Sequence, residues 1–427
     1  MREMKNSASE WIGDIPKAWD VVQLGSLFSE HKNKNTGMQC NNLLSLSYGN
    51  IIRKDINTSD GLLPESFEGY NVIDEGDIVL RLTDLQNDQR SLRVGLSHER
   101  GIVTSAYVTL RKRNPAMSSQ FFYYLIHSYD VRKGFYGMGA GVRQGLNYAG
   151  VRKIMLTLPS VNEQTAIAEF LKKKTTQVDA LIANVRAQIE KLKVYKQRVI
   201  AEAVTKGLDP TAPMKDSGVE WVPQIPATWE MSRVGLHYTI ILGKMLCPNQ
   251  IDDGYTLEKY YCAANVHFGE INSDELKEMW FSPAEKEQYR IFAGDMLIVE
   301  GGAGAGGCAI VERDTDALVQ NSVMIVRNRN GVDNRYLRYW IESMVKRGYL
   351  DVVCNKATIP HYTKEKLAKT IIPVLPQDEQ KQIADFLDTK CSQIDQFIAI
   401  KQTKIEKLEQ YKRSLIYEYV TGKKEVS

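Results

Sequence analysis

Apolar residues recur at seven-residue intervals in two long stretches of the chain, 163–205 and 379–421. This period is typical of a helix that packs along another helix. Neither stretch contains Pro or Gly, and both are rich in residues with high helix propensity. Each stretch therefore predicts one uninterrupted helix, roughly 65 Å long at about 1.5 Å per residue.

We expect the two helices to pack as an antiparallel intramolecular coiled coil, because they match in length and nearly half of their aligned residues are identical. Lys401 interrupts the second apolar series. Two unrelated core helices remain the alternative. The expected seam residues are Leu171, Val178, Leu181, Val185, Leu192 and Tyr195 in the first helix and Leu387, Ile394, Phe397, Leu408, Tyr411 and Leu415 in the second.

The segments before these helices show short apolar runs separated by polar, Gly-rich connections. Such runs are typical of β-strands, and they lie at 76–82, 102–111, 294–300 and 323–328. A helical pattern follows in each half, at 118–136 and at 334–350. Each half therefore predicts a mixed α+β globule.

This arrangement occurs twice in the chain. The sequence "EWIGDIPKAW" at 10–19 returns as "EWVPQIPATW" at 220–229. We therefore expect an α+β protein with two tandem globules and two long helices, related by a pseudo-twofold axis. The expected segments are a first globule at 1–155, a first helix at 156–207, a linker at 208–217, a second globule at 218–372 and a second helix at 373–427.

Composition excludes several classes of protein. The six cysteines contain no C-x-x-C pair and the six histidines no H-x-x-x-H pair, so we expect reduced thiols and no metal site. No apolar run approaches the length of a membrane span, and we expect a cytoplasmic protein. The net charge of +3 requires any nucleic-acid surface to be a local cluster of basic residues.

A Gly-rich stretch at 300–312 satisfies the dinucleotide-binding pattern G-x-G-x-x-G by its letters. That pattern functions only where it opens a helix, and here a strand-like run follows. We interpret the stretch as a hairpin loop and keep a nucleotide cradle as the alternative. The sequence has no catalytic motif of an adenine methyltransferase, a helicase or a P-loop ATPase, so we expect a binding protein without catalytic residues.

Two loops in each globule carry candidate DNA-binding residues. Arg, Asn, Gln and Asp side chains are those that read base edges, and Gly allows the backbone to approach phosphates. Solvated loops without function would have a similar composition. The candidates in the first half are Arg81, Asp84, Gln86, Asn87, Arg90 and Arg93, followed by Arg143, Gln144 and Asn147, and those in the second half are Lys244, Lys356, Thr358, His361 and Tyr362.

The doubled plan, the two "EW…IP..W" sequences and the loop "LRLTDLQNDQRSLRVG" at 80–95 resemble the specificity subunits of type I restriction–modification systems. The "LP…EQ…IA.FL" helix starts at 158–171 and 375–387 also resemble those of this family. The resemblance covers essentially the whole chain. It implies that each globule is a target-recognition domain for one half of a split double-stranded DNA site, with the helices as a spacer.

The same resemblance implies that the helices dock two methyltransferase subunits and that restriction subunits join the full complex. S-adenosylmethionine, ATP and Mg²⁺ would then bind to these partners, and the chain itself would bind no cofactor and catalyse no reaction. The competing interpretation is a non-enzymatic scaffold whose two globules bind polypeptides.

Overall fold

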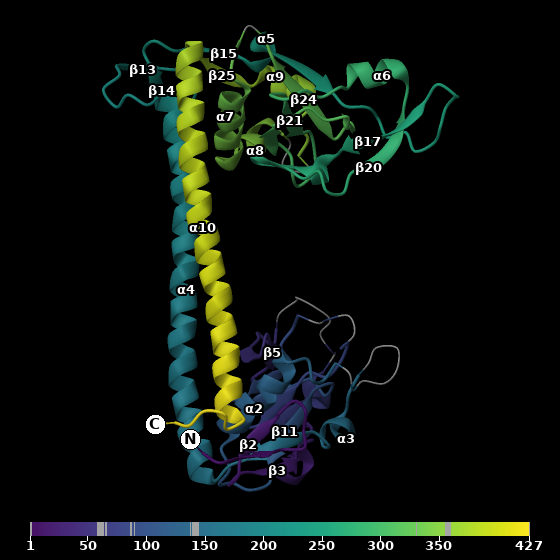
Figure 1. Ribbon diagram of the computed structural model, residues 1–427, viewed down its shortest axis with the longest axis vertical. Helices are drawn as coiled ribbons and strands as arrows, with labels where there is room; N and C mark the ends of the chain where they lie inside the picture. Colours follow the sequence, from purple (N-terminus) through teal and green to yellow (C-terminus); the bar gives the residue numbers. More distant parts are fainter. Residues whose placement is uncertain are drawn as a thin grey trace. The chain divides into compact units, whose positions relative to one another are not determined.

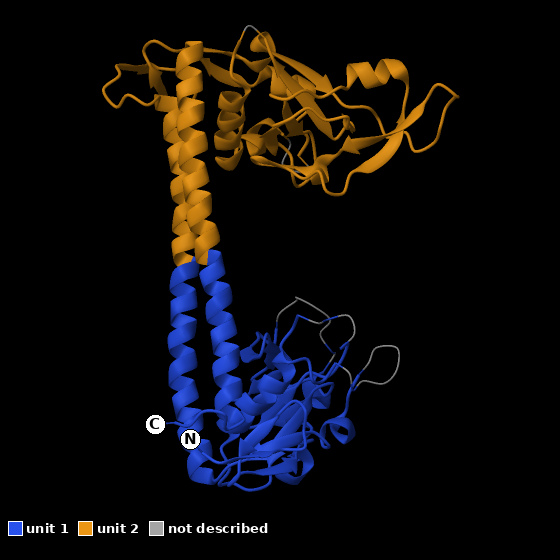
Figure 2. Cartoon of the chain, in the orientation of Figure 1, with its two compact units in different colours: residues 1–186, 402–427 blue, residues 187–401 orange. Residues whose placement is uncertain are grey.

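The computed structural model describes residues 2–57, 64, 66–85, 88, 90–136, 138, 145–329, 331–354 and 360–426. Its backbone divides into two compact units (Figure 2). Unit 1 comprises residues 1–186 and 402–427, and unit 2 comprises residues 187–401. The sequence-based boundaries give each long helix a segment of its own, whereas both helices are in fact divided between the units.

Each unit is built around a four-stranded antiparallel sheet with the same strand order (Figure 1). The sheet of unit 1 consists of β4 (Phe28–Glu30), β11 (Val108–Lys112), β8 (Ile78–Leu80) and β9 (Val94–Leu96). The sheet of unit 2 consists of β16 (Tyr238–Leu242), β24 (Val323–Asn328), β21 (Met296–Val299) and β22 (Cys308–Ile310). The expected strand-like runs and the α+β class are therefore confirmed.

One amphipathic helix packs on each sheet. It is α2 (Ser119–Val131) in unit 1 and α7 (Asn334–Lys346) in unit 2. Both begin at a polar cap, because Ser118 and Asp333 accept a hydrogen bond from a backbone N–H of the first turn. Their apolar faces join the main hydrophobic core of the unit together with the sheet and the long helices.

Shorter elements complete the two units. Those of unit 1 are β1 (Met4–Asn6), β2 (Asp14–Pro16), β3 (Asp20–Gln23), α1 (Leu24–Leu27), β5 (Leu44–Ser47), β6 (Asn50–Arg53), η1 (Phe67–Gly69), β7 (Asn71–Ile73), β10 (Gly101–Val103), α3 (Tyr148–Val151) and β12 (Met155–Leu158). Those of unit 2 are β13 (Met214–Asp216), β14 (Gln224–Pro226), β15 (Glu230–Arg233), α5 (Val234–His237), β17 (Thr256–Tyr261), η2 (Ala263–Asn265), β18 (Val266–His267), β19 (Glu270–Ile271), β20 (Lys277–Phe281), α6 (Pro283–Gln288), β23 (Leu318–Val319), α8 (Tyr349–Val353), α9 (Lys364–Lys369) and β25 (Ile371–Val374).

The repeated "EW…IP..W" sequence packs the start of each globule against the start of a long helix. Trp19 is buried, and its Nε1 donates to Glu163 Oε1 at 3.2 Å, in the first turn of α4 (Val161–Lys206). In unit 2, Trp229 is also buried and donates to Glu379 at 3.0 Å. The repeat therefore encodes a packing contact that each unit contains once.

The helix α4 and the helix α10 (Gln377–Val420) run antiparallel within each unit. In unit 1, Lys412 donates to Asp179 at 2.7 Å, and in unit 2, Lys196 pairs with Asp395 at 2.6 Å. The two ion pairs join equivalent residues of the repeat. Both helices are uninterrupted, as their sequences predict.

The structure corrects four of the twelve predicted seam residues. Leu171, Val178, Val185, Leu387, Ile394 and Leu415 are buried, and Leu192 and Leu408 are half-buried. Four predicted seam residues instead lie at the surface, with exposed fractions of 49% for Leu181, 53% for Tyr195, 57% for Phe397 and 52% for Tyr411.

The reason is an ambiguity of the seven-residue period. A companion seam residue can lie three or four positions after a given one, and a single series does not distinguish the two. The prediction placed Leu181 three positions after Val178, whereas the buried companions are Ile182 and Ile189, each 6% exposed. The seam thus contains the residues four positions later.

Candidate nucleic-acid interface

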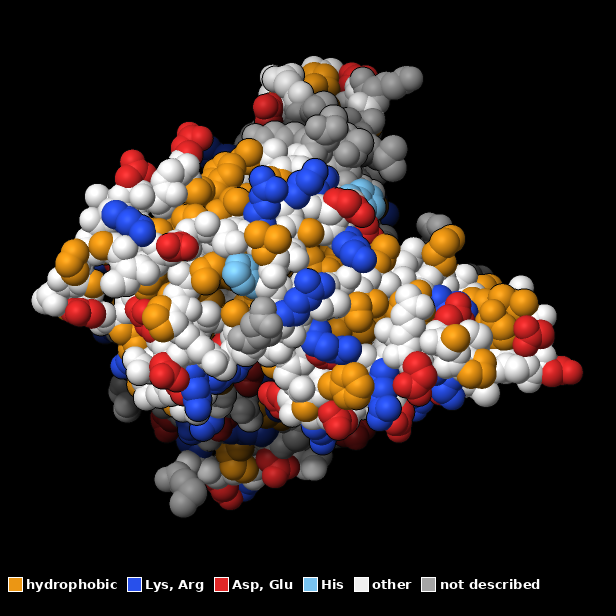
Figure 3. Space-filling model, turned by 90° about the horizontal axis from the view of Figure 1, so that it is seen from above, with side chains coloured by type: hydrophobic (Ala, Val, Ile, Leu, Met, Phe, Trp, Pro, Cys, Tyr) orange, Lys and Arg blue, Asp and Glu red, His pale blue; other side chains and the backbone are white. Residues whose placement is uncertain are grey.

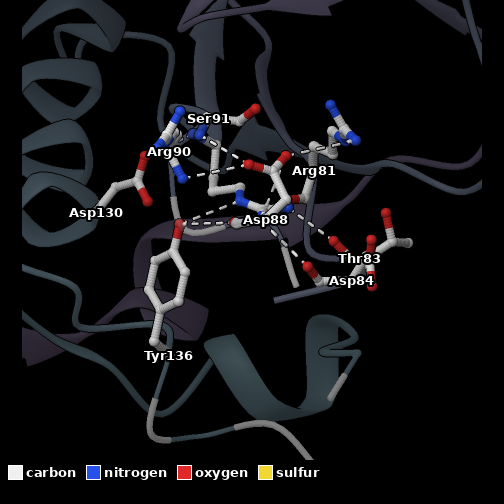
Figure 4. A network of polar contacts seen from close by, with 9 residues as sticks. Arg81, Thr83, Asp84, Asp88, Arg90, Ser91, Asp130 and Tyr136 are labelled. Atoms are coloured by element: carbon white, nitrogen blue, oxygen red, sulfur yellow. Dashed lines mark hydrogen bonds and ion pairs between the residues drawn. The ribbon is translucent and has the colours of Figure 1, made fainter. Parts of the chain in front are cut away.

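The loop between β8 and β9 contains a network of polar contacts around Asp88 (Figure 4). The Arg93 side chain is fully buried. Its guanidinium donates to the carbonyl oxygen of Thr83 at 2.7 Å and also to that of Asp88. Arg93 was predicted to read bases, but a fully buried guanidinium that bonds to loop carbonyls is not available to DNA in this structure. Its role here is to shape the loop.

Asp130 on α2 binds the backbone of the same loop. Its Oδ2 accepts the backbone N–H of Arg93 at 2.5 Å. Burial raises the pKa of Asp130 to about 6, against the opposing effects of the Arg93 N–H and of nearby positive charge. In the loop, hydrogen bonds from Ser91 lower the pKa of Asp88 to about 2. The loop is therefore a polar network fixed to the core of unit 1.

Three candidate residues of this loop stay accessible. Arg90 is exposed, and Arg81 and Asp84 are half-buried. Arg81 lies 3.7 Å from Asp88, close enough for an ion pair. Asp84 has a φ of 57°, in the left-handed region that Asp tolerates better than most residues. Gln86 and Asn87 lie outside the described residues.

The second candidate loop lies beside the first. Leu146 N–H donates to Leu82 O at 2.9 Å. The next residue, Asn147, is exposed, and its Oδ1 accepts from Gly150 N–H at 3.1 Å at the start of α3. Arg143 and Gln144 lie outside the described residues. Asn147 therefore adjoins the first loop, although its side-chain oxygen is engaged in a helix cap.

Unit 2 joins its two loops in the same way. Tyr362 N–H donates to Glu300 O at 2.6 Å. His361 is exposed and lies over Gly301, where a Cβ would come within 2.8 Å of the imidazole Nδ1. Tyr362 was predicted to contact DNA, but its side chain is buried and its hydroxyl lies 2.6 Å from Thr370 Oγ1. Lys356 and Thr358 lie outside the described residues.

The Gly-rich stretch at 300–312 forms a hairpin loop. Gly306 N–H donates to Val299 O at 2.9 Å, and Val299 N–H donates to Gly307 O at 2.8 Å. The strand β22 follows at Cys308 without an intervening helix. The hairpin interpretation is therefore confirmed, because a dinucleotide cradle needs a helix N-terminus at this place.

Lys244 is a further correction. Its side chain is buried, forms an ion pair with Glu285, and lies over the rings of Tyr255 at 4.9 Å and Phe281 at 5.2 Å. A buried and paired ammonium of this kind fixes the chain between β16 and β17. The partner Glu285 belongs to the Ser282–Glu285 capping box at the start of α6.

One cluster in unit 1 has the composition of a metal site. His31, Asp74 and Asp77 place possible ligand atoms within 4.8 Å of one another. Arg111 already donates to Asp74 at 2.7 Å and to Asp77 at 2.5 Å, so its positive charge offsets part of the negative charge of the two carboxylates. The six cysteines are free thiols. In the part of the chain that the structure describes, no helix is long and apolar enough to cross a membrane.

Known proteins are similar to this chain in sequence and in fold. Residues 264–410 match the type I restriction modification DNA specificity domain. The type I restriction enzyme MjaVIII specificity subunit of Methanocaldococcus jannaschii is 24% identical over 423 residues, which cover 96% of this chain and 93% of that protein.

Two solved structures resemble the whole chain. One comes from work on the structural basis of complex assembly and conformational transition of the type I R-M system. Its TM-score is 0.71 and its sequence identity is 15%, and the alignment covers 95% of this chain and 98% of that chain. The other is the HsdS subunit of Thermoanaerobacter tengcongensis, with a TM-score of 0.51 and 16% identity over 96% and 98%. Residues 264–410 therefore match a type I restriction modification DNA specificity domain, and the similarity to type I restriction enzyme specificity subunits extends over almost the whole chain.

Proposed function

We propose that this chain is the DNA sequence-recognition subunit of a type I restriction–modification complex, and that each globule reads one half of a bipartite, asymmetric target. The observation that carries the proposal is the shared frame of the two units. Both join their loops by an equivalent backbone hydrogen bond, Leu146 to Leu82 and Tyr362 to Glu300. The side chains on these loops differ, as expected of two related readers of different base sequences.

The helices α4 and α10 are the proposed spacer. A helix of 46 residues is roughly 69 Å long at about 1.5 Å per residue. Half-sites on one face of B-DNA lie about 34 Å apart per helical turn, so two such helices are long enough to separate two readers. We infer that they form one antiparallel coiled coil with a pseudo-twofold axis. The equivalent ion pairs Asp179–Lys412 and Lys196–Asp395 support this inference.

The four predicted seam residues that are exposed form the proposed docking sites for two methyltransferase subunits. They are Leu181, Tyr195, Phe397 and Tyr411. Leu181 and Tyr411 flank the Asp179–Lys412 ion pair of unit 1 in sequence. Phe397 and Tyr195 flank the Lys196–Asp395 ion pair of unit 2 in the same way. Large exposed apolar side chains at repeated positions fit two copies of one partner.

In this proposal the catalytic work belongs to the partners. The methyltransferase subunits would bind S-adenosylmethionine, and restriction subunits in the full complex would use ATP and Mg²⁺. The chain itself would contribute DNA contacts and docking surfaces and no catalytic residue.

Single-molecule methylome sequencing of a strain that expresses the chain with its methyltransferase tests the proposal. We expect one methylated motif with two specified halves and an unspecified spacer. A polypeptide-binding scaffold would give no motif, and a single continuous motif would contradict two separate readers.

A further inference from the structure

A short helix follows the second loop directly in both units. In unit 1, α3 begins one residue after Asn147, and in unit 2, α9 begins one residue after Thr363. Both helices lie against equivalent short helices, since Gly25 N–H of α1 donates to Arg152 O and Val234 N–H of α5 donates to Thr370 O, each at 2.9 Å. The loops and these helices thus form consecutive parts of one framework.

Basic side chains are exposed at this place in both units. Seen from above, unit 2 shows Lys and Arg side chains gathered across the middle of the face that carries α5 and α9 (Figure 3). The basic surface, as we call it, consists of Arg113, Arg152 and Lys153 in unit 1 and of Arg329, Lys364 and Lys369 in unit 2. Two of the positions are equivalent between the units, because Arg113 and Arg329 follow the strands β11 and β24, and Lys153 and Lys369 precede β12 and β25.

Close packing holds these residues together. In unit 1, Arg113 Nε donates to Gly25 O at 3.2 Å, and Gly25 also donates to Arg152 O. A Cβ on Gly25 would lie 2.9 Å from the Cβ of Arg152, so glycine permits this approach. In unit 2, Gly235 allows the same approach to Ala368, whose Cβ would lie at 3.0 Å.

The charge of the basic surface is largely unbalanced within the protein. Among the described residues, none of its six members is in an ion pair, and Glu365 on α9 offsets part of the charge of its neighbours Lys364 and Lys369. Exposed cations at the same positions of two domains attract a polyanion and fix its position. Because phosphates repeat regardless of base sequence, such contacts position DNA without reading it.

We propose that the basic surface of each unit binds the DNA phosphates next to its half-site and thereby positions the reading loops. This inference rests on the proposed function, because it assigns a second surface to the same DNA-binding activity. Arg152, Lys153, Lys364 and Lys369 are positioning residues that carry no base specificity.

The test compares the salt dependence of DNA binding by the full chain, purified with its methyltransferase. The variants are Arg152→Gln/Lys153→Gln in unit 1 and Lys364→Gln/Lys369→Gln in unit 2. The control is Lys5→Gln/Lys17→Gln, which removes the same charge from the exposed β1–β2 region. The probes are a random duplex library, to define the motif, and one duplex that contains the enriched motif.

We expect each double variant to enrich the same motif as the wild type, with weaker binding at every salt concentration. Because each double variant neutralises about two fewer phosphates, the fall in affinity between about 50 and 200 mM salt should be about tenfold smaller than for the wild type. The control should keep the wild-type salt slope.

Two results overturn this inference. Salt slopes equal to that of the control would show that the surface does not touch DNA. Loss of the methyltransferase from the purified variants, with an unchanged slope, would identify an acidic protein surface as the partner instead. A wild type that enriches no motif would contradict the proposed function itself.

Discussion

At the scale of single residues, the proposed reading loop of unit 1 depends on buried groups that cannot face DNA. Arg93 and Asp130 are buried and determine where Arg90 is presented. The sequence showed a polar loop rich in Arg and Asp, and it had no period that separates inward from outward side chains. Burial of Arg93, Lys244 and Tyr362 was therefore not predictable, whereas the location of the loop was.

Replacing Asp130 tests the electrostatics of this anchor. The folded pKa is raised from 3.8 to about 6, so its contribution to stability is full below about pH 4 and falls as the pH rises to about 6. Asp130→Asn keeps an oxygen for the Arg93 N–H and removes the charge. We expect the variant to be more stable than the wild type by about 3 kcal/mol at pH 7 and nearly equally stable near pH 4.

Denaturant unfolding at several pH values measures this difference. A variant that is less stable than the wild type at pH 7 would show that the buried Arg93 guanidinium needs the Asp130 charge.

Substitutions of Arg90 and Arg93 should distinguish a residue that reads bases from a residue that maintains the loop structure. Arg90→Ala removes an exposed side chain, so we expect a roughly 5- to 150-fold loss of methylation at targets with one particular half-site, and unchanged stability. Arg93→Ala leaves several loop carbonyls without a donor, and we expect it to lower the free energy of unfolding by about 3 kcal/mol. Methylome sequencing and denaturant unfolding of both variants check this pair, and equal relaxation of both half-sites by Arg90→Ala would contradict independent readers.

At the scale of elements, the sequence predicted that the two long helices exist and where they begin and end. It predicted only part of the face that each helix buries against the other. The seven-residue period gave the series Leu171, Val178 and Val185 correctly. It did not show whether the second seam residue lies three or four positions after the first, because that depends on the partner helix. The residues predicted on the wrong side, such as Leu181 and Tyr411, are the ones now available to a partner.

The corrected seam makes a direct stability prediction. Ile182→Ala opens a cavity in a buried contact, and we expect a loss of about 2–4 kcal/mol. Its neighbour Leu181 is 49% exposed, so Leu181→Ala should change the free energy of unfolding by less than about 1 kcal/mol. Thermal or denaturant unfolding compares the two, and equal losses would restore the original seam.

The docking proposal predicts a change in stoichiometry. We expect Leu181→Ser/Tyr411→Ser to weaken one of two methyltransferase sites by about tenfold or more, leaving one bound subunit per chain. Val194→Ser is the matched control, because Val194 is 70% exposed on α4 and has no apolar counterpart in the repeat. Native mass spectrometry counts the bound subunits. Two bound subunits in the double variant, or one in the control, would rule out this surface.

At the scale of the whole molecule, the internal repeat gives the plan of the protein. It predicted two similar globules and two matched helices, and each unit indeed contains the same sheet order, the same Trp–Glu contact and the same helix ion pair. It did not predict that both helices are divided between the units, since that follows from contacts between distant residues. The base sequence of the proposed target could not be predicted, because loop composition gives donors and acceptors without their positions.

The central claim is that two separate readers are held apart by the helices. The most direct test lengthens α4 after Arg186 and α10 before Gln402 by one heptad each, at the boundary between the two units, and determines the methylome of the strain. A heptad adds about 10 Å, or about three base pairs. The account predicts the two original half-sites with a longer unspecified spacer. Altered half-sites, or an unchanged spacer with full activity, would contradict it.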